Sequence, residues 1–168
     1  MELVNKNLAF VWRSLRRFGV RAADVDDATQ RVFLIVHEKL AAIERGRERA
    51  FLIGVAVRVA SHVRRAYKRR DAAEQRFSST PTAANPNPEE VTQQLEAREL
   101  LDRVLDGMPE DLRTVFVLFE LEELSVDEIA RVLALPRGTV ATRLRRSREE
   151  FHASSKVVAA EVEGIERG

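Results

Sequence analysis

The most informative stretch of the sequence lies at residues 124–148 and reads LSVDEIARVLALPRGTVATRLRRSR. Ser125, followed three residues later by Glu128, forms the capping-box pattern that marks the start of a helix. Pro136 and Gly138 interrupt the helical pattern, and Val140 opens a second run with apolar residues on one side. A short helix, a turn and a second helix form the helix-turn-helix pattern, whose second helix lies in the major groove of DNA.

The charge around this stretch favours DNA as its partner. Residues 136–148 hold five arginines and no acid, whereas residues 98–128 hold three basic and ten acidic residues. A basic helix on an acidic body attracts phosphate at one place and repels it elsewhere. The alternative is an amphipathic helix whose charges only face water. The capping box, the turn and the five arginines together favour DNA binding.

A second basic segment lies near the middle of the chain. Residues 58–70 hold six positively charged side chains and no acid. Helical spacing places Arg58, His62, Arg65 and Arg69 on one face. The opposite face carries an apolar stripe and is expected to be core. A solvated face is again the alternative, but two basic helices suggest two contacts with one nucleic acid.

The remaining sequence predicts an all-α fold of two small helical modules. Residues 78–90 read SSTPTAANPNPEE, a composition that can neither continue a helix nor bury an apolar face. Trp12 is expected in the core of the first helix, and Asp24 as the N-cap of the second. The expected organisation is a first module at 1–76, a Pro-rich linker at 77–92, a second module at 93–152 and a tail at 153–168.

Composition excludes several classes of protein. The chain has 168 residues and no cysteine, so it holds no disulfide and no thiolate metal site. No uncharged apolar run approaches the ~20 residues of a membrane span, and we expect a cytoplasmic protein without one. The acids Asp24, Asp26 and Asp27 are explained by helix capping better than by a metal. Without a catalytic motif, we expect no enzyme activity, cofactor or metal site.

Three stretches together resemble a known family, over nearly all of residues 5–151. They are DDATQRVF at 26–33, FLIGVAVRVA at 51–60, and 105–151 with its LPRGTV at 135–140. Their order and spacing are similar to those of the bacterial sigma factors of the extracytoplasmic-function (ECF) group of the sigma-70 family. Three positions depart from the family pattern: Arg31 replaces an acid, Val57-Arg58 an Arg-Asn pair, and Ala141 a basic residue.

The resemblance implies a function, partners and site residues. Such a protein binds core RNA polymerase, directs it to promoters at the −10 and −35 elements and helps melt the −10 region. The modules would then be a region 2-like unit of three or four helices and a region 4-like helix-turn-helix unit. The resemblance implies contacts of Asp26, Asp27, Gln30 and Phe33 with the beta-prime clamp helices, of Arg58, Ser61, His62, Arg65 and Arg69 with the −10 element, and of Arg137, Thr139, Thr142, Arg143, Arg145, Arg146 and Arg148 with the −35 element.

Further implications are less specific. The acidic face of 98–123 would meet the beta flap, and the 44–49 loop would help hold the melted −10 strand. Phe51 and Tyr67 are candidates for stacking on bases, and an anti-sigma factor is a further possible partner. Two other functions stay open: a stand-alone helix-turn-helix regulator, and a helical interaction protein that does not support transcription.

Overall fold

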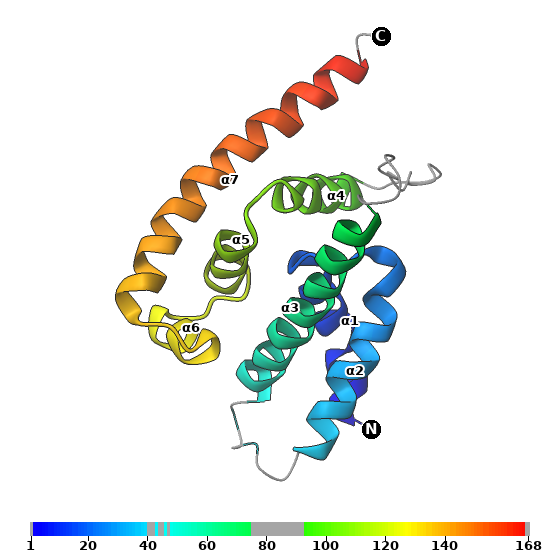
Figure 1. The fold of residues 1–168 in the computed structure, drawn as a ribbon, viewed down its shortest axis with the longest axis vertical. Helices are drawn as coiled ribbons and strands as arrows, with labels where there is room; N and C mark the ends of the chain where they lie inside the picture. The colour runs from blue at the N-terminus through cyan, green and yellow to red at the C-terminus, as the bar shows by residue number, and fades with distance from the viewer. Residues whose placement is uncertain (1, 40–42, 44–45, 47, 75–92, 167–168) are drawn as a thin grey trace.

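The computed structural model of the chain describes residues 2–39, 43, 46, 48–74 and 93–166. The linker predicted at 77–92 and residues 44, 45 and 47 of the predicted 44–49 loop lie outside these residues, and residues 48 and 49 of that loop instead begin a helix. All elements of the described residues are helices, without a β-strand, and the prediction of an all-α fold is confirmed (Figure 1).

The first module is built from three helices and a short 3₁₀ turn. These are α1 (Glu2–Arg17), η1 (Ala22–Asp24), α2 (Val25–Glu38) and α3 (Glu48–Glu74). Apolar residues recur every three or four positions, so each helix turns one stripe inward. The fully buried side chains of the module include Val11 and Leu15 of α1, Val32 and Val36 of α2, and Leu52 and Ile53 of α3.

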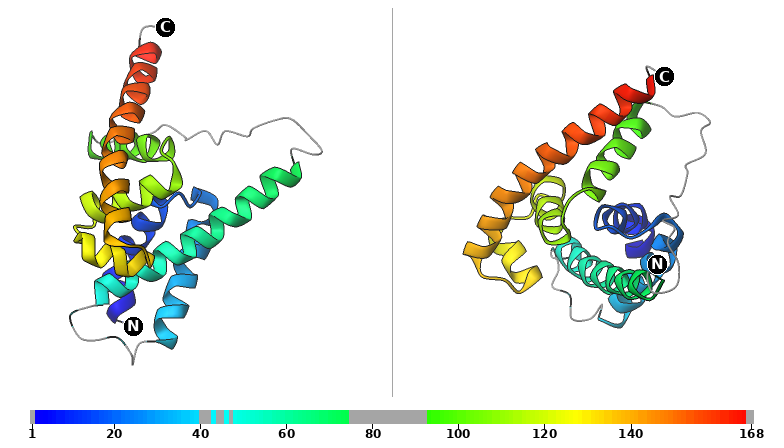
Figure 2. Two further views of the ribbon diagram at one scale, coloured as in Figure 1. Left: turned by 60° about the vertical axis from the view of Figure 1, so that its left-hand side comes forward. Right: turned by 45° about the horizontal axis from the view of Figure 1, so that its top comes forward.

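The second module surrounds a short central helix. It comprises α4 (Gln93–Asp106), α5 (Glu110–Phe116), a π-helical continuation η3 (Val117–Leu121), α6 (Val126–Leu133) and α7 (Arg137–Glu166). Helix α7 runs along the outside of the module, and its end reaches far from the N-terminus (Figures 1 and 2). Phe116 of α5 stacks on Phe151 of α7 with ring centroids 4.5 Å apart, which anchors the middle of this long helix.

The helix-turn-helix signals at 124–148 produce the expected local structure. The Ser125 hydroxyl accepts a hydrogen bond from the Glu128 backbone N–H, and the Glu128 carboxylate accepts one from the Ser125 N–H at 2.8 Å. Ala134 adopts a left-handed conformation with φ of 53° and ends α6. Ile129 and Val140, one on each helix, are fully buried. The turn therefore joins two helices that share one core.

Asp24 does not cap the second helix as predicted. It stands at the N-terminal boundary of α2, but its side chain makes no capping hydrogen bond. Its carboxylate instead accepts a hydrogen bond of 2.6 Å from the hydroxyl of Tyr67 on α3. Burial and this carboxylate raise the pKa of Tyr67 above its ordinary value. Tyr67 is only 8% exposed, so its ring is packed and does not offer a free face for a base.

The tail expected at 153–168 does not begin with a structural break. Helix α7 continues without interruption from Arg137 to Glu166. Ser154 and Val158 are buried, because α4 packs against this part of α7. The buried side chains of this part of α7 therefore serve packing inside the second module.

The two modules pack against each other through α3. Sequence periodicity predicts one apolar stripe on α3, yet Val55 and Val57 are buried together with Leu52 and Ala56. The additional burial arises because α6 of the second module covers another side of α3 (Figure 2). The Cα of Gly54 lies so near α6 that an added Cβ would touch Val132 at 3.9 Å. The buried residues of both modules form one continuous cluster.

Replacing Ser125 by alanine tests the capping box. The change removes the acceptor of the Glu128 N–H, and we expect a loss of about 1 kcal/mol in the free energy of unfolding. Urea denaturation followed by circular dichroism measures it. Ser155→Ala is the matched control, because the Ser155 hydroxyl bonds only to the carbonyl of His152 within α7. Equal effects of the two substitutions would contradict the role of the cap.

Candidate nucleic-acid and polymerase interface

The N-terminal half of α7 carries the residues expected at the −35 element on an accessible surface. Arg137, Arg145 and Arg148 are exposed, while Arg143 is half-buried. Each guanidinium forms an ion pair with a nearby acid of the second module. The pairs are Arg137–Asp127 at 2.7 Å, Arg143–Asp111 at 3.5 Å, Arg145–Glu149 at 2.8 Å and Arg148–Glu120 at 2.8 Å.

These ion pairs do not fix the arginine side chains strongly. Exposed ion pairs contribute little net free energy, so phosphate or a base edge can replace the carboxylate. Arg146 is exposed and has no polar partner among the described residues. Thr139 is half-buried, and the exposed Thr142 donates its hydroxyl hydrogen to the carbonyl of Gly138. The residues expected at the −35 element therefore share one helix but differ in how far their side chains are exposed to solvent.

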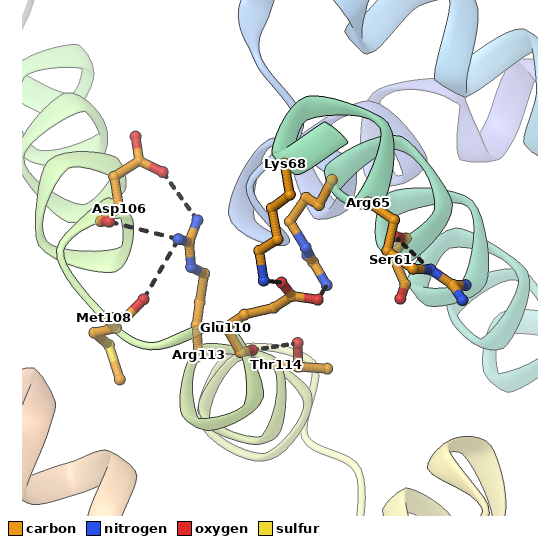
Figure 3. Close-up of polar contacts among 9 residues, drawn as sticks. Ser61, Arg65, Lys68, Asp106, Met108, Glu110, Arg113 and Thr114 are labelled. Atoms are coloured by element: carbon orange, nitrogen blue, oxygen red, sulfur yellow. Dashed lines mark hydrogen bonds and ion pairs between the residues drawn. The ribbon is translucent and has the colours of Figure 1, made fainter. Parts of the chain in front are cut away.

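Helix α3 divides its basic residues between two faces. Arg58, His62, Arg65 and Arg69, expected at the −10 element, are exposed, and Ser61 is half-buried. The Arg65 guanidinium donates a hydrogen bond of 3.3 Å to the Ser61 carbonyl and points away from the second module (Figure 3). The helix therefore keeps one basic face open to solvent.

The other basic face of α3 contacts an acid of the second module. Glu110 at the start of α5 accepts hydrogen bonds from Arg64 at 2.9 Å and from Lys68 at 3.0 Å (Figure 3). Burial raises the pKa of Glu110, but the two cations outweigh it and hold the pKa below its ordinary value. The contacts of Glu110 with Arg64 and Lys68 therefore stabilise the folded state at neutral pH. This stabilisation is lost as the pH falls through the lowered pKa of Glu110.

A second acid of the same module is almost completely buried. Glu122, just after η3, has a side chain only 2% exposed. Its carboxylate accepts hydrogen bonds from the Ser14 hydroxyl at 3.2 Å, and from Arg17 and Arg49 at 3.4 Å. All three donors belong to the first module. A buried carboxylate without such partners would be strongly unfavourable, so Glu122 requires the two modules to be in contact.

Arg113 of α5 faces the first module beside these acids. Its guanidinium forms an ion pair of 2.9 Å with Asp106, and its burial lowers its pKa. Gly19 faces this group with φ of 85°, and an added Cβ would lie 2.5 Å from Arg113 Nη1. The positive φ, which L side chains rarely adopt, favours glycine there.

An apolar groove between α1 and α2 gathers the residues expected to contact polymerase. The groove has a volume of about 570 Å³ and is lined by Asp26, Gln30 and Phe33 together with Leu8, Trp12, Leu34 and other residues. Asp26 and Gln30 are exposed, whereas Phe33 is 9% exposed. Asp27 is exposed on the same helix but does not line the groove.

Trp12 is not in the core, and that prediction is wrong. Its side chain is 39% exposed, and its indole N–H donates a hydrogen bond of 2.9 Å to the Asp26 carboxylate. Leu8 and Leu34 are also exposed, at 48% and 59%. The sequence did not identify Leu8, Trp12 and Leu34 as surface residues. Apolar periodicity in a helix is the same whether a neighbouring helix or a partner protein covers that face.

Neither a metal site nor a membrane helix emerges from the described part of the chain. Its residues include no group of three or more His, Asp or Glu side chains placed to hold a metal ion. The acids of the Asp24–Asp27 segment are separated, because Asp24 contacts Tyr67 and Asp26 contacts Trp12. None of the described helices is long and apolar enough to cross a membrane.

Comparison with known proteins assigns both modules. Residues 3–70 match the family Sigma-70 region 2, and residues 98–151 match the family Sigma-70, region 4. The chain is 34% identical over 140 residues to the ECF RNA polymerase sigma-E factor of Escherichia coli K12, covering 77% of this chain and 73% of the relative. It is 28% identical over 152 residues to the ECF RNA polymerase sigma factor SigE of Mycolicibacterium smegmatis, covering 89% of this chain and 59% of that relative's length.

Two solved structures share the fold. The sigma factor RpoE of Bartonella quintana, in complex with the anti-sigma factor NepR, aligns with a TM-score of 0.67 at 17% identity, over 94% of this chain and 99% of its own. CnrH, in complex with the cytosolic domain of CnrY, aligns with a TM-score of 0.62 at 24% identity, over 90% and 84%. The chain belongs to the ECF sigma factors of the sigma-70 family, which are transcription initiation factors.

The pairing of Trp12 with Asp26 makes a spectroscopic prediction, because Trp12 is the only tryptophan of the chain. Asp26→Ala removes the acceptor of the indole N–H, so the ring meets more water, and we expect its fluorescence emission to move to longer wavelength. Asp27→Ala is the control, since Asp27 lies outside the groove. An equal shift in both variants would contradict the described geometry.

Proposed function

We propose that this chain binds core RNA polymerase, directs it to promoters through the −10 and −35 elements and assists melting at −10. The observation that carries the proposal is the coexistence of three separate accessible surfaces. They are the arginine-rich start of α7, the outer face of α3 and the apolar groove between α1 and α2. A stand-alone regulator needs only the first of these.

The start of α7 is proposed to read the −35 element. Recognition helices of helix-turn-helix proteins contact base edges through their N-terminal residues. Arg137, Thr139, Thr142, Arg143 and Arg145 occupy that part of α7. Arg146 and Arg148 lie further along and are assigned mainly to phosphates, which position the protein on the duplex without reading its sequence.

The outer face of α3 is proposed to hold the −10 element. Arg58, Arg65 and Arg69 supply positive charge beside a single strand, and Ser61 and His62 supply hydrogen-bonding groups. Phe51, near the start of α3, is half-buried and is the remaining candidate for stacking on a base.

The groove between α1 and α2 is proposed as the contact with the beta-prime clamp helices. An exposed apolar patch with polar groups at its edge is typical of a protein interaction site. Asp26, Asp27, Gln30 and Phe33 contribute as the family resemblance implies, and Trp12 and Leu34 enlarge the apolar area. The acidic face of 98–123 is proposed for the beta flap.

The remaining assignments follow from this role. A factor that brings polymerase to chromosomal promoters acts in the cytoplasm and needs no catalytic group of its own. The solved relative from Bartonella quintana is bound to an anti-sigma factor, which supports a partner of the same kind for this chain.

Transcription with purified components tests the proposal. Core polymerase and this chain together should produce a promoter-specific transcript that neither produces alone. Leu34→Asp places a charge in the apolar groove, and we expect it to abolish the transcript by preventing assembly with polymerase. Val157→Asp, at an apolar position on α7 that is equally exposed (59%) and lies outside the groove, is the control. A chain that binds promoter DNA but gives no transcript would instead be a regulator.

Two arginines of α7 should behave differently on DNA. We expect Arg145→Ala to weaken binding by about 1–3 kcal/mol on DNA with a matched −35 element and much less on scrambled DNA. Arg148→Ala should weaken binding on both and reduce the salt slope by about 1. Lys156→Ala, an exposed position further along α7, is the control. Equal losses on both DNAs for Arg145→Ala would refute base reading.

A further inference from the structure

Four arginine side chains gather at a pocket that the proposed function does not use. The pocket lies between α1 and α4 and has a volume of about 230 Å³. Its arginines are Arg13, Arg16 and Arg17 of α1 and Arg98 of α4. We call it the arginine pocket. Trp12 and Asp102 are also in its wall.

Helical spacing and helix packing together place these arginines around one pocket. Arg13, Arg16 and Arg17 follow one another at intervals of three and one, so they lie within one turn and a half of α1. Helix α4 packs against α1 and adds Arg98 from the other module. Because the two segments lie far apart in the sequence, only the tertiary structure brings their charges together.

Arg13 and Arg98 carry positive charge that the described part of the protein does not neutralise. Both are exposed, and neither has a hydrogen bond or an ion pair with another described residue. Like charges at one site repel each other, and a partly enclosed site screens them less than open water does. A bound anion would remove this repulsion.

Arg16 and Arg17 are held in the pocket by contacts of their own. Both are half-buried. The Arg16 guanidinium donates a hydrogen bond to the Val20 backbone carbonyl, and Arg17 forms an ion pair of 3.4 Å with Glu122. Their place in the last turn of α1 also suits the helix dipole. These side chains are therefore ordered before any ligand arrives, which lowers the entropic cost of binding one.

The two acids in the wall of the pocket do not cancel its positive charge. Glu99 and Asp102 form no ion pair with the arginines of the pocket in the described structure. Burial is the main cause that raises the pKa of Asp102, and it outweighs the opposite effect of Arg16 and Arg17. Four guanidinium groups against two carboxylates leave the pocket positively charged.

The size of the pocket favours a small anion. Pockets for drug-sized organic ligands measure about 300–1,000 Å³, and this one is smaller at about 230 Å³. At ~30 Å³ for each water molecule, the pocket has room for roughly eight of them. That space suits one or two phosphate groups better than a whole nucleotide or a peptide segment.

We propose that the arginine pocket binds a small phosphoryl oxyanion with two or more negative charges, of the pyrophosphate type. The inference goes beyond the proposed function and does not rest on it, because the chain alone should bind the anion. Planar guanidinium groups donate paired hydrogen bonds to phosphate oxygens, and arginines on two walls can hold two phosphate groups at once. Free pyrophosphate and the diphosphate of ADP share this chemistry, and the size of the pocket favours the free anion.

Isothermal titration calorimetry of the full chain with sodium pyrophosphate, at an ionic strength of about 0.15 M, tests the proposal. We expect one binding site with a Kd below about 1 mM. Arg13→Gln combined with Arg98→Gln removes two charges that make no contact with other described residues, so the fold should be kept. The Kd should rise about tenfold or more. Arg98→Gln alone replaces the double variant if circular dichroism shows that the latter is unfolded.

Arg131→Gln combined with Lys156→Gln is the matched control, because it removes two exposed positive charges outside the pocket. We expect its Kd to change less than about twofold. The control is needed because the chain carries other basic surfaces that attract anions without specificity. An equal loss of affinity in both double variants, or the absence of measurable binding by the parent chain, would overturn the proposal.

Trp12 reports whether the anion lies in this pocket, because it is the only tryptophan of the chain and lines the pocket. Its fluorescence should change with the same midpoint as the heat of binding. Heat without any change in fluorescence would place the anion elsewhere and contradict the proposal.

Two further anions test the proposed chemistry. Sulfate and ADP should each bind no more tightly than pyrophosphate, sulfate because it offers a single tetrahedral group and ADP because its nucleoside does not fit. Equal affinity for sulfate and pyrophosphate would indicate an adventitious anion only and would refute the phosphoryl assignment. Tighter binding of ADP, weakened by Arg13→Gln with Arg98→Gln, would refute the assignment to a free anion.

Discussion

The carboxylate of Glu122 is 2% exposed and accepts hydrogen bonds from Ser14, Arg17 and Arg49. A buried charge is tolerated only with compensating partners, and all the partners of this one belong to the other module. The contact therefore brings the end of η3 against α1 and the start of α3. That packing buries a second side of α3 and makes one core out of two modules.

The same contact changes the meaning of the charge distribution. The net charge of +1 conceals an acidic segment between two basic ones. The acidic segment partly neutralises both neighbours: Glu110 pairs with the inner face of α3, and Asp111 and Glu120 pair with α7. Basic groups on the outer face of α3 and along the start of α7 stay exposed. Positive charge is thereby concentrated where promoter DNA is proposed to bind.

The apolar groove between α1 and α2 shows the opposite balance, because its apolar side chains are left uncovered. Leu8, Trp12 and Leu34 stay exposed, although packing elsewhere is close. An apolar area of this kind is stabilised when a partner covers it. Asp26 orients the Trp12 ring through a hydrogen bond, so the acid that the family pattern marks also arranges the apolar surface beside it. The intramolecular packing thus leaves this apolar surface free for the polymerase contact proposed above.

The sequence by itself determined the local structure and the class of protein. The capping box at Ser125 and the turn at Pro136 depend on neighbouring residues only, and both form as predicted. Only the tertiary structure decided the roles of Trp12, Tyr67 and Arg64. Each lies at a helical position that could face the core, the other module or solvent, and periodicity specifies a face without naming what covers it. The pairing of Glu122 with Arg17, 105 positions apart, is likewise decided by how whole helices pack.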